Sequence, residues 1–202
     1  MECPYCKQID KGFFEFNGTN LGNRIVYETE NFIVFPSIGQ IVEGYLLIAP
    51  KKHYLSIAAL PNELFNELEF VKKKIEETLT NIYIKPIFFE HGSVSEKQRA
   101  GCCVTHAHIH AVPADVSISD FLSKNFIANK IKFYSELPKN EAYLFLEEKN
   151  ERFVYSIEEF VPSQYLRKII ANRLGCAEKG DWRAYPGINE LKKTIEKLKP
   201  FL

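Results

Sequence analysis

The most informative stretch of the chain is His106-Ala107-His108-Ile109-His110-Ala111-Val112, which holds three of the five histidines in alternation with small or apolar residues. Alternation is the period of a β-strand, so we expect the three imidazoles to share one face of a sheet. A buried stripe of three histidines leaves up to six ring nitrogens in need of partners, at roughly 1–3 kcal/mol for each unmet group. Imidazole can act as a nucleophile, an acid–base group or a metal ligand near neutral pH. The stretch therefore predicts a functional site.

The composition is that of an ordinary globular protein, with 202 residues, 46% hydrophobic residues, 26 basic and 26 acidic side chains. This length suggests one domain, or one domain with an extension. The balanced charge argues against nonspecific binding to nucleic acid, and no apolar run approaches the roughly 20 residues that span a bilayer. The first residues, Met1 to Cys6, are neither basic nor apolar as a secretory signal would be. We expect a cytoplasmic protein with no membrane partner.

The chain has five cysteines, which in a reducing compartment are interpreted as thiols or metal ligands before disulfides. Cys3 and Cys6 form a C-x2-C motif with a proline in the intervening turn. This spacing suits tetrahedral zinc, which needs two more ligands. The candidates are His53 and one histidine of the 106–112 stretch.

Short apolar runs and one amphipathic segment outline the fold. The segment 61–81 begins at a proline and has apolar residues at the spacing of a helix face. We expect strands on both sides of this helix, at residues 25–27, 32–35, 44–50, 86–90 and 103–112. This order predicts an α+β fold in which an antiparallel sheet has helices packed on one face.

The pattern continues beyond residue 115. A helix is expected from Ser119, followed by strands at 143–146 and 153–157 and by helices at 162–175 and 189–198. We therefore divide the chain into a core at residues 1–115 and a helical C-terminal extension at residues 116–202 that packs on this core.

The stretch 106–112 resembles the His-φ-His-φ-His-φ-φ signature of the histidine triad (HIT) family. The surrounding order is also similar: strand 44–50, then Lys51-Lys52-His53, a helix, and a loop ending in Ala100-Gly101. The resemblance covers roughly residues 1–115 and implies a HIT-like, nucleotide-binding catalytic core with nucleotidyl hydrolase or transferase activity. Related uridylyltransferases have glutamine where this chain has His110, which favours a hydrolase.

The resemblance implies a role for each catalytic histidine. His108 corresponds to the nucleophile that attacks the α-phosphorus and forms a nucleotidyl-histidine intermediate, which water then hydrolyses. His110 would lie beside the phosphate and stabilise its developing charge. The implied substrate is a nucleotide phosphoanhydride or phosphoramidate, of the dinucleoside polyphosphate type.

HIT proteins with an amino-terminal C-x2-C motif also resemble this chain. They use both cysteines, an upstream histidine and the first triad histidine to hold a structural zinc ion. Here these ligands are Cys3, Cys6, His53 and His106, a closed site of four ligands. Relatives often pair through the core helix and sheet, which makes a homodimer an expectation.

The expected nucleotide contacts depart from the family pattern at several positions. Relatives carry glutamine or serine near the end of the loop, where this chain has Cys102 and Cys103 after Gly101, and a thiol is a weak donor. Ser37 stands where an acidic residue usually holds the ribose. Phe35 is expected in the base pocket, although a strand aromatic can equally be core, and the two thiols can equally be buried apolar groups.

Two other functions stay open. The altered pocket is compatible with a nucleotide-binding or adaptor module that lacks turnover. Alternatively, all three triad histidines bind one catalytic metal. Outside the core, Arg167, Arg173 and Arg183 either reach a polyphosphate or are solvated, and solvation is the default for arginine on a helix. His91 either contacts phosphate or lies exposed in a loop, and we expect the exposed position.

Overall fold

The computed structural model describes residues 3–95, 100, 101, 103–158 and 160–202. The longer helices are α1 (Pro4–Lys11), α2 (Phe65–Ile82), α3 (Ser119–Asn125), α4 (Tyr165–Arg173) and α5 (Ile188–Leu198). Short 3-10 turns are η1 (Ile57–Ala59), η2 (Asn62–Leu64), η3 (Tyr134–Glu136), η4 (Ala177–Gly180) and η5 (Lys199–Phe201). The strands are β1 (Glu15–Phe16), β2 (Thr19–Asn20), β3 (Tyr27–Glu28), β4 (Phe32–Pro36), β5 (Leu46–Pro50), β6 (Ile87–Gly92), β7 (Ile109–Val112), β8 (Ala128–Ile131), β9 (Tyr143–Glu148) and β10 (Glu151–Ser156).

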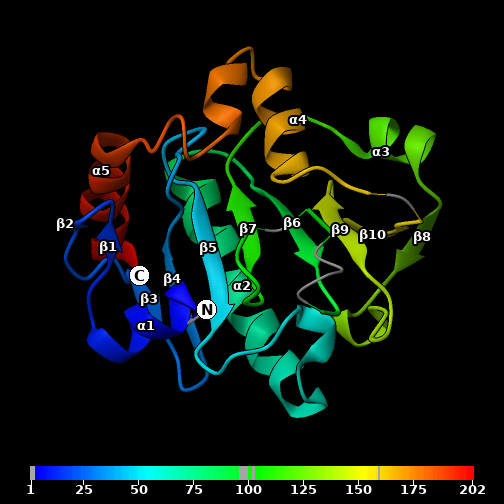
Figure 1. Cartoon of the computed structure of the whole chain (residues 1–202), viewed down its shortest axis with the longest axis horizontal. Helices are drawn as coiled ribbons and strands as arrows, with labels where there is room; N and C mark the ends of the chain where they lie inside the picture. The colour runs from blue at the N-terminus through cyan, green and yellow to red at the C-terminus, as the bar shows by residue number, and fades with distance from the viewer. Residues whose placement is uncertain (1–2, 96–99, 102, 159) are drawn as a thin grey trace.

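The main sheet has eight strands in the order β3-β4-β5-β7-β6-β9-β10-β8, and every neighbouring pair is antiparallel (Figure 1). Strand β7 lies near the centre, where His110 is opposite Leu47 of β5 and Phe89 of β6. Strands on both sides fix the backbone of β7. His110, the one triad histidine within β7, is therefore held between two strands.

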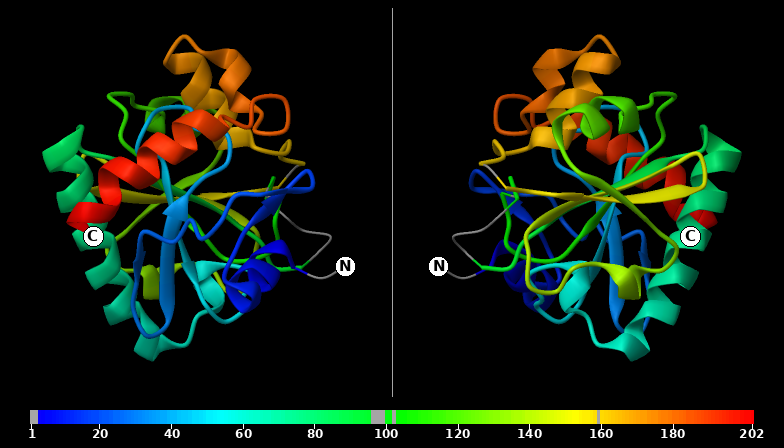
Figure 2. Two further views of the ribbon diagram at one scale, coloured as in Figure 1. Left: turned by 90° about the vertical axis from the view of Figure 1, so that its left-hand side faces the viewer. Right: turned by 90° about the vertical axis from the view of Figure 1, so that its right-hand side faces the viewer.

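Apolar side chains cover both faces of this sheet. On one face, α2 buries Leu68, Val71, Ile75 and Leu79 against strand residues that include Ile109. On the other face, α3 and α4 pack with side chains such as Leu122 and Ile170. Helix α1 packs on this second face too, so α1 and α2 lie on opposite sides of the sheet (Figure 2). His110 alternates with Ile109 and therefore faces α4 rather than α2.

The expected mixed fold with an antiparallel sheet and C-terminal helices is confirmed. The core helix α2 covers one face as expected, and α4 of the extension covers the other. Strands β8, β9 and β10 follow residue 116 and continue the same sheet, because β9 pairs with β6. The boundary at residue 115 stays a prediction.

Two details of the expected elements differ from the structure. The strand expected at 103–112 is paired only from Ile109 to Val112. Before it, the chain follows a loop instead of a strand, and the amide of Ala107 donates to the carbonyl of Tyr54 at 2.7 Å. Helix α1 was not expected, because the sequence places only a turn between the two cysteines.

The extension contacts the core closely at Gly39. This residue has a positive φ of 72°, and a Cβ atom there would lie 2.4 Å from the Cβ of Trp182 and 2.7 Å from Nη2 of Arg167. Only glycine allows both the backbone conformation and this approach. The loop after β4 is therefore shaped to receive the extension.

Among the described residues, no helix has the length and apolar character needed to cross a membrane. The cytoplasmic location and the homodimer stay predictions.

Candidate active site and metal centre

A cavity of about 340 Å³ opens beside the second and third triad histidines. It lies on the α4 face of the sheet, and its walls come from the amino-terminal segment, the loop after β4, the loop before β7 and the extension. The lining residues used below are Tyr5, Phe14, Glu15, Arg24, Ser37, His91, Gly101, Cys103, His108, His110, Gln164, Arg167 and Trp182. The site therefore combines segments from the whole length of the chain.

His108 has one ring nitrogen fixed by the backbone. Its Nδ1 lies 2.7 Å from the carbonyl oxygen of His106, so Nδ1 carries the proton and donates it. The other nitrogen, Nε2, then has a free lone pair. Burial lowers the pKa of His108 to about 4, because the charged ring would lose its hydration. His108 is therefore a neutral imidazole at neutral pH.

His110 is held from two sides. Its ring stacks on Phe89 with centroids 4.2 Å apart and an angle of 9° between the planes. Its Nδ1 lies 2.7 Å from the hydroxyl of Tyr45. With the tyrosine as donor, His110 keeps its proton on Nε2, and burial lowers the pKa of this ring well below 6.5. The centroids of His108 and His110 are 4.7 Å apart.

His91 was expected in an exposed loop, which is wrong. It lies in β6, is 7% exposed, and its Nε2 accepts the backbone amide of Leu166 in α4 at 3.3 Å. Burial lowers the pKa of this ring to about 3. The alternation Ile87, Phe89, His91 could have revealed this position, because Phe89 and His91 share one face of the strand.

Most of the expected nucleotide contacts line the cavity. Ser37, Gly101 and Cys103 are among its walls. Phe35 is fully buried and is not among the lining residues, because it packs against the ring of Tyr5. Cys102 lies outside the described residues.

The side chains of Ser37 and Cys103, which line the cavity, already have hydrogen-bond partners in the protein. The hydroxyl of Ser37 donates to the carbonyl of Ile38 at 2.9 Å. The sulfur of Cys103 lies 2.8 Å from the hydroxyl of Ser163. Both groups therefore face the cavity while tied to its walls.

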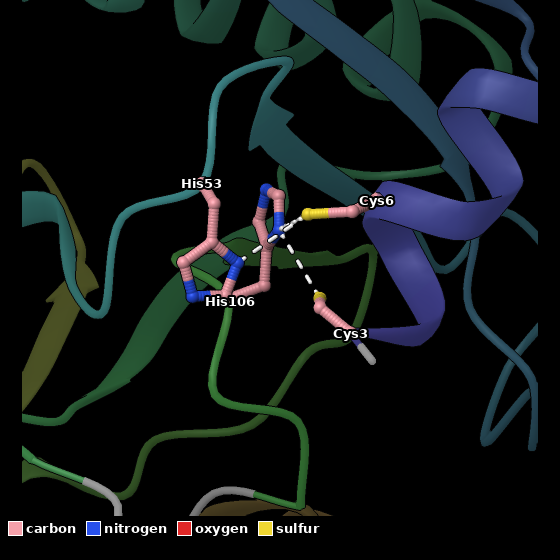
Figure 3. Close-up of side chains that lie close together, drawn as sticks. All are labelled: Cys3, Cys6, His53 and His106. Carbon is pink, nitrogen blue, oxygen red and sulfur yellow. Dashed lines mark hydrogen bonds between the residues drawn. The ribbon is translucent and has the colours of Figure 1, made fainter. Parts of the chain in front are cut away.

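The four expected zinc ligands come together at one point (Figure 3). Their ligand atoms all lie within 4.8 Å of one another: the sulfurs of Cys3 and Cys6 and ring nitrogens of His53 and His106. Among the described residues, the group does not include His108 or His110. His106 thus lies in the group of possible metal ligands, whereas His108 and His110 line the cavity.

The distances fit a tetrahedral zinc ion. Zinc with bonds of about 2.3 Å to sulfur and about 2.0 Å to nitrogen holds these ligand atoms roughly 3.5 Å apart. In the structure, Nδ1 of His106 is 3.4 Å from Sγ of Cys3 and 3.5 Å from Sγ of Cys6, and Nδ1 of His53 is 3.4 Å from Sγ of Cys6. The other nitrogen of His106, Nε2, donates to the carbonyl of Pro50 at 2.8 Å, which leaves Nδ1 unprotonated for a metal.

Helix α1 explains how the two sulfurs converge. Pro4 occupies the first helical position, and the amide of Lys7 donates to the carbonyl of Cys3 at 3.0 Å. Cys6 is therefore nearly one turn after Cys3 and on the same side of the helix. Burial and the adjacent Cys3 thiol raise the pKa of the Cys6 thiol to about 11. A metal cation bound by both sulfurs would replace the thiol protons and stabilise the two thiolates.

Comparison with known proteins identifies the class. The sequence model of the HIT domain matches residues 19–116. An uncharacterized HIT-like protein of Methanocaldococcus jannaschii is 33% identical over 114 residues, which cover 55% of this chain and 78% of that protein. The chain belongs to the HIT family.

Solved structures of the same family are also similar to the chain. A HIT family protein from Bacillus anthracis is 29% identical, with 55% of this chain and 72% of that chain covered and a TM-score of 0.45. A Zn-bound histidine triad family protein from Mycobacterium smegmatis is 21% identical, with 59% and 79% covered and a TM-score of 0.43.

Proposed function

We propose that this protein is a nucleotidyl hydrolase that cleaves a nucleotide phosphoanhydride or phosphoramidate through a nucleotidyl-histidine intermediate. The observation that carries the proposal is the orientation of His108 in the cavity. Its Nδ1 is used by the carbonyl of His106, so the lone pair of Nε2 is available for attack. A neutral, oriented imidazole is a competent nucleophile toward phosphorus.

The reaction proceeds in two displacements. Nε2 of His108 attacks the α-phosphorus, a P–N bond forms, and the bond from phosphorus to the leaving group breaks with the electron pair on that group. Water then attacks the same phosphorus and loses one proton to solvent, the P–N bond breaks with its electron pair on Nε2, and a mononucleotide and neutral His108 are released. Dividing one displacement into two lowers each barrier.

His110 supports both steps. With Nδ1 accepting from Tyr45, its Nε2–H can donate to a nonbridging phosphoryl oxygen. Gly101 and Cys103 line the same cavity, and their backbone amides are the further donors that we propose for the phosphate. Charge that grows on the phosphoryl oxygens is thereby stabilised.

We further propose that Cys3, Cys6, His53 and His106 hold a structural zinc ion. Four protein ligands leave no open position for a substrate or a reactive water, so the ion ties α1 to the segment before β7 and takes no part in the chemistry. The separate surroundings of His106 argue against one catalytic metal bound by all three triad histidines.

The test is hydrolysis of diadenosine polyphosphates and of adenosine phosphoramidate by the wild type and by His108→Ala. We expect turnover in the wild type and its loss in the variant. Quenching at alkaline pH, where the P–N bond survives, should reveal by mass spectrometry a nucleotidyl adduct on the wild type and none on the variant. The thermal midpoint of the variant serves as the control for folding.

Full activity of His108→Ala would refute the nucleophile. Nucleotide binding by the wild type without turnover or adduct would indicate a binding module instead.

A further inference from the structure

Two arginine side chains line the cavity of His108 although they are almost inaccessible to solvent. Arg24 is 1% exposed and precedes β3, and Arg167 is 3% exposed and comes from α4 of the extension. The expectation that Arg167 is solvated is therefore wrong. Arginine is rarely buried without a partner, so both side chains call for an explanation.

Arg24 is held by neutral groups. Its Nε and Nη2 donate to the side-chain oxygen of Gln8 at 3.2 and 2.7 Å, and its Nη1 donates to the carbonyl of Pro36 at 2.8 Å. The guanidinium also lies over the rings of Phe14, at 3.7 Å, and Phe35, at 4.4 Å. These contacts fix the position of the charge without neutralising it.

Arg167 has a less complete set of partners. Its Nη2 donates to the carbonyl of Gly39 at 2.6 Å, and its Nη1 makes a long bond of 3.3 Å to the hydroxyl of Ser37. Its Nε is buried and has no hydrogen-bond partner among the described residues. The guanidinium lies 5.0 Å from the ring centroid of Tyr45, the residue that contacts His110. An unused buried donor destabilises the protein unless a ligand accepts from it.

Elsewhere among the described residues, a buried lysine and a half-buried arginine are paired with acids. Lys72 forms ion pairs with Glu76 and Glu147, and Arg152 pairs with Glu69 and Glu147. Among the described residues, neither Arg24 nor Arg167 has a carboxylate oxygen within 4.0 Å. The missing partners are therefore specific to the cavity.

The cavity is consequently positive. Glu15 is the one acidic side chain in the described lining, and it is exposed. Burial lowers the pKa of both His91 and His110, which keeps these rings neutral, so the two arginines carry the charge. Two buried cations without acids cost free energy in the unliganded protein, and an anion of the ligand would recover it.

We infer that Arg167, assisted by the charge of Arg24, binds a second phosphate group of the substrate, next to the phosphoryl group that His108 attacks. A guanidinium presents several N–H donors in one plane, a geometry that matches two oxygens of a phosphate. This inference rests on the proposed hydrolase and narrows its substrate class to phosphoanhydrides with at least two phosphates. A phosphoramidate has one phosphate and would leave Arg167 unused.

The binding test uses AMP and ADP, which differ by one phosphate, and isothermal titration calorimetry. We expect the wild type to bind ADP more tightly than AMP by about 10- to 100-fold, the effect of charge-assisted hydrogen bonds. In Arg167→Gln this ratio should fall close to one, and in Arg167→Lys it should be intermediate. Arg173→Gln is the matched control, because it removes the same charge from an exposed position of the same helix and should keep the ratio. A ratio is insensitive to the fraction of misfolded protein, since both ligands report on folded molecules.

An ADP to AMP ratio that is the same in wild type and Arg167→Gln would overturn the inference. The kinetic counterpart is kcat/KM for a diadenosine polyphosphate against adenosine phosphoramidate, which should lose selectivity in Arg167→Gln. The two proposals fail separately. An ADP preference that depends on Arg167, without turnover, would refute the proposed hydrolase and support the phosphate subsite. Turnover without that preference would support the hydrolase and refute the subsite.

Discussion

The three triad histidines have the same side chain and alternate spacing, yet their free ring nitrogens differ in position or in protonation. His106 donates from Nε2 to Pro50 and keeps Nδ1 for the metal group. His108 donates from Nδ1 to the carbonyl of His106 and keeps Nε2. His110 receives Tyr45 at Nδ1 and keeps a proton on Nε2. The neighbours of each ring therefore fit the different roles that we propose for one repeated residue type: metal ligand, nucleophile and hydrogen-bond donor.

Removing the hydroxyl of Tyr45 tests the assignment of His110. In Tyr45→Phe the ring of His110 loses the contact that fixes its tautomer, so fewer molecules present Nε2–H to the phosphate. We expect kcat to fall about tenfold, the value of one hydrogen bond near 1.4 kcal/mol. KM should change little, because the phenyl ring keeps its packing. An unchanged kcat would show that the tautomer of His110 does not matter to the reaction.

Glu90 gives the protein a pH-dependent stability. It is buried on β6, accepts the hydroxyl of Tyr143 at 2.6 Å and the amide of Ile57 at 2.8 Å, and burial raises its pKa from 4.5 to about 7. The folded state then binds the proton more tightly than the unfolded state. The contribution of Glu90 to the free energy of unfolding is greatest below pH 4.5 and falls as pH rises to about 7, by on the order of 3 kcal/mol.

Denaturant unfolding of wild type and Glu90→Gln at about pH 5 and pH 8 measures this effect. Glutamine stays neutral at both values, so the variant should lose less stability on going to the higher pH. The histidines titrate in both proteins, and the difference between the two isolates Glu90. Parallel pH profiles would contradict the assignment.

The sequence reveals some of these residues and misses others for physical reasons. Alternation identified the triad, and the C-x2-C spacing identified Cys3 and Cys6, because both patterns are local. For Arg167 the sequence left two alternatives, a contact with polyphosphate or solvation, and solvation was the default for arginine on a helix. Its spacing pointed inward, since Ile170 and Ala171 are the buried residues three and four positions later on α4.

Among the elements, α1 shows why a short segment is hard to predict. It has 8 residues, about two turns, so an apolar face has too little length to repeat, and Gln8 is its one buried residue. Helix α2 was predictable because its 18 residues repeat an apolar face over several turns. The strand expected at 103–112 forms only over Ile109–Val112. Before it, Ala107 pairs with Tyr54 in a loop, which no local pattern reveals.

The stability of α1 should depend on the metal. We expect Cys6→Ser to lose bound zinc, measured by mass spectrometry of the metal, and to lower the thermal midpoint by on the order of 10 °C. Cys176→Ser is the matched control, because Cys176 is a free cysteine outside the ligand group and should leave both values unchanged. Equal zinc content in Cys6→Ser and Cys176→Ser would refute the proposed zinc site.

For the whole molecule, the contact at Gly39 joins the extension to the core. Gly39→Ala should lower stability by several kcal/mol and weaken nucleotide binding, because the new Cβ would collide with Trp182 and Arg167. Gly175→Ala is the matched control, since it has the same φ of 72° and nothing within 4 Å of the new Cβ. It should show only the backbone strain of about 1–2 kcal/mol. An equal loss of stability in the two variants would mean that the contact of the extension with Gly39 does not contribute to stability.

Arg167 and Ser37 meet in the cavity wall although they are 130 positions apart. When the ribosome has synthesised the chain through β7, His108 is already present. The nascent chain then still lacks β9, which pairs with β6, and α4, which lines the cavity. Contacts between such distant segments form late in folding. Nucleotide should therefore be retained only by chains that have left the ribosome complete, which would make ligand retention a measure of finished synthesis.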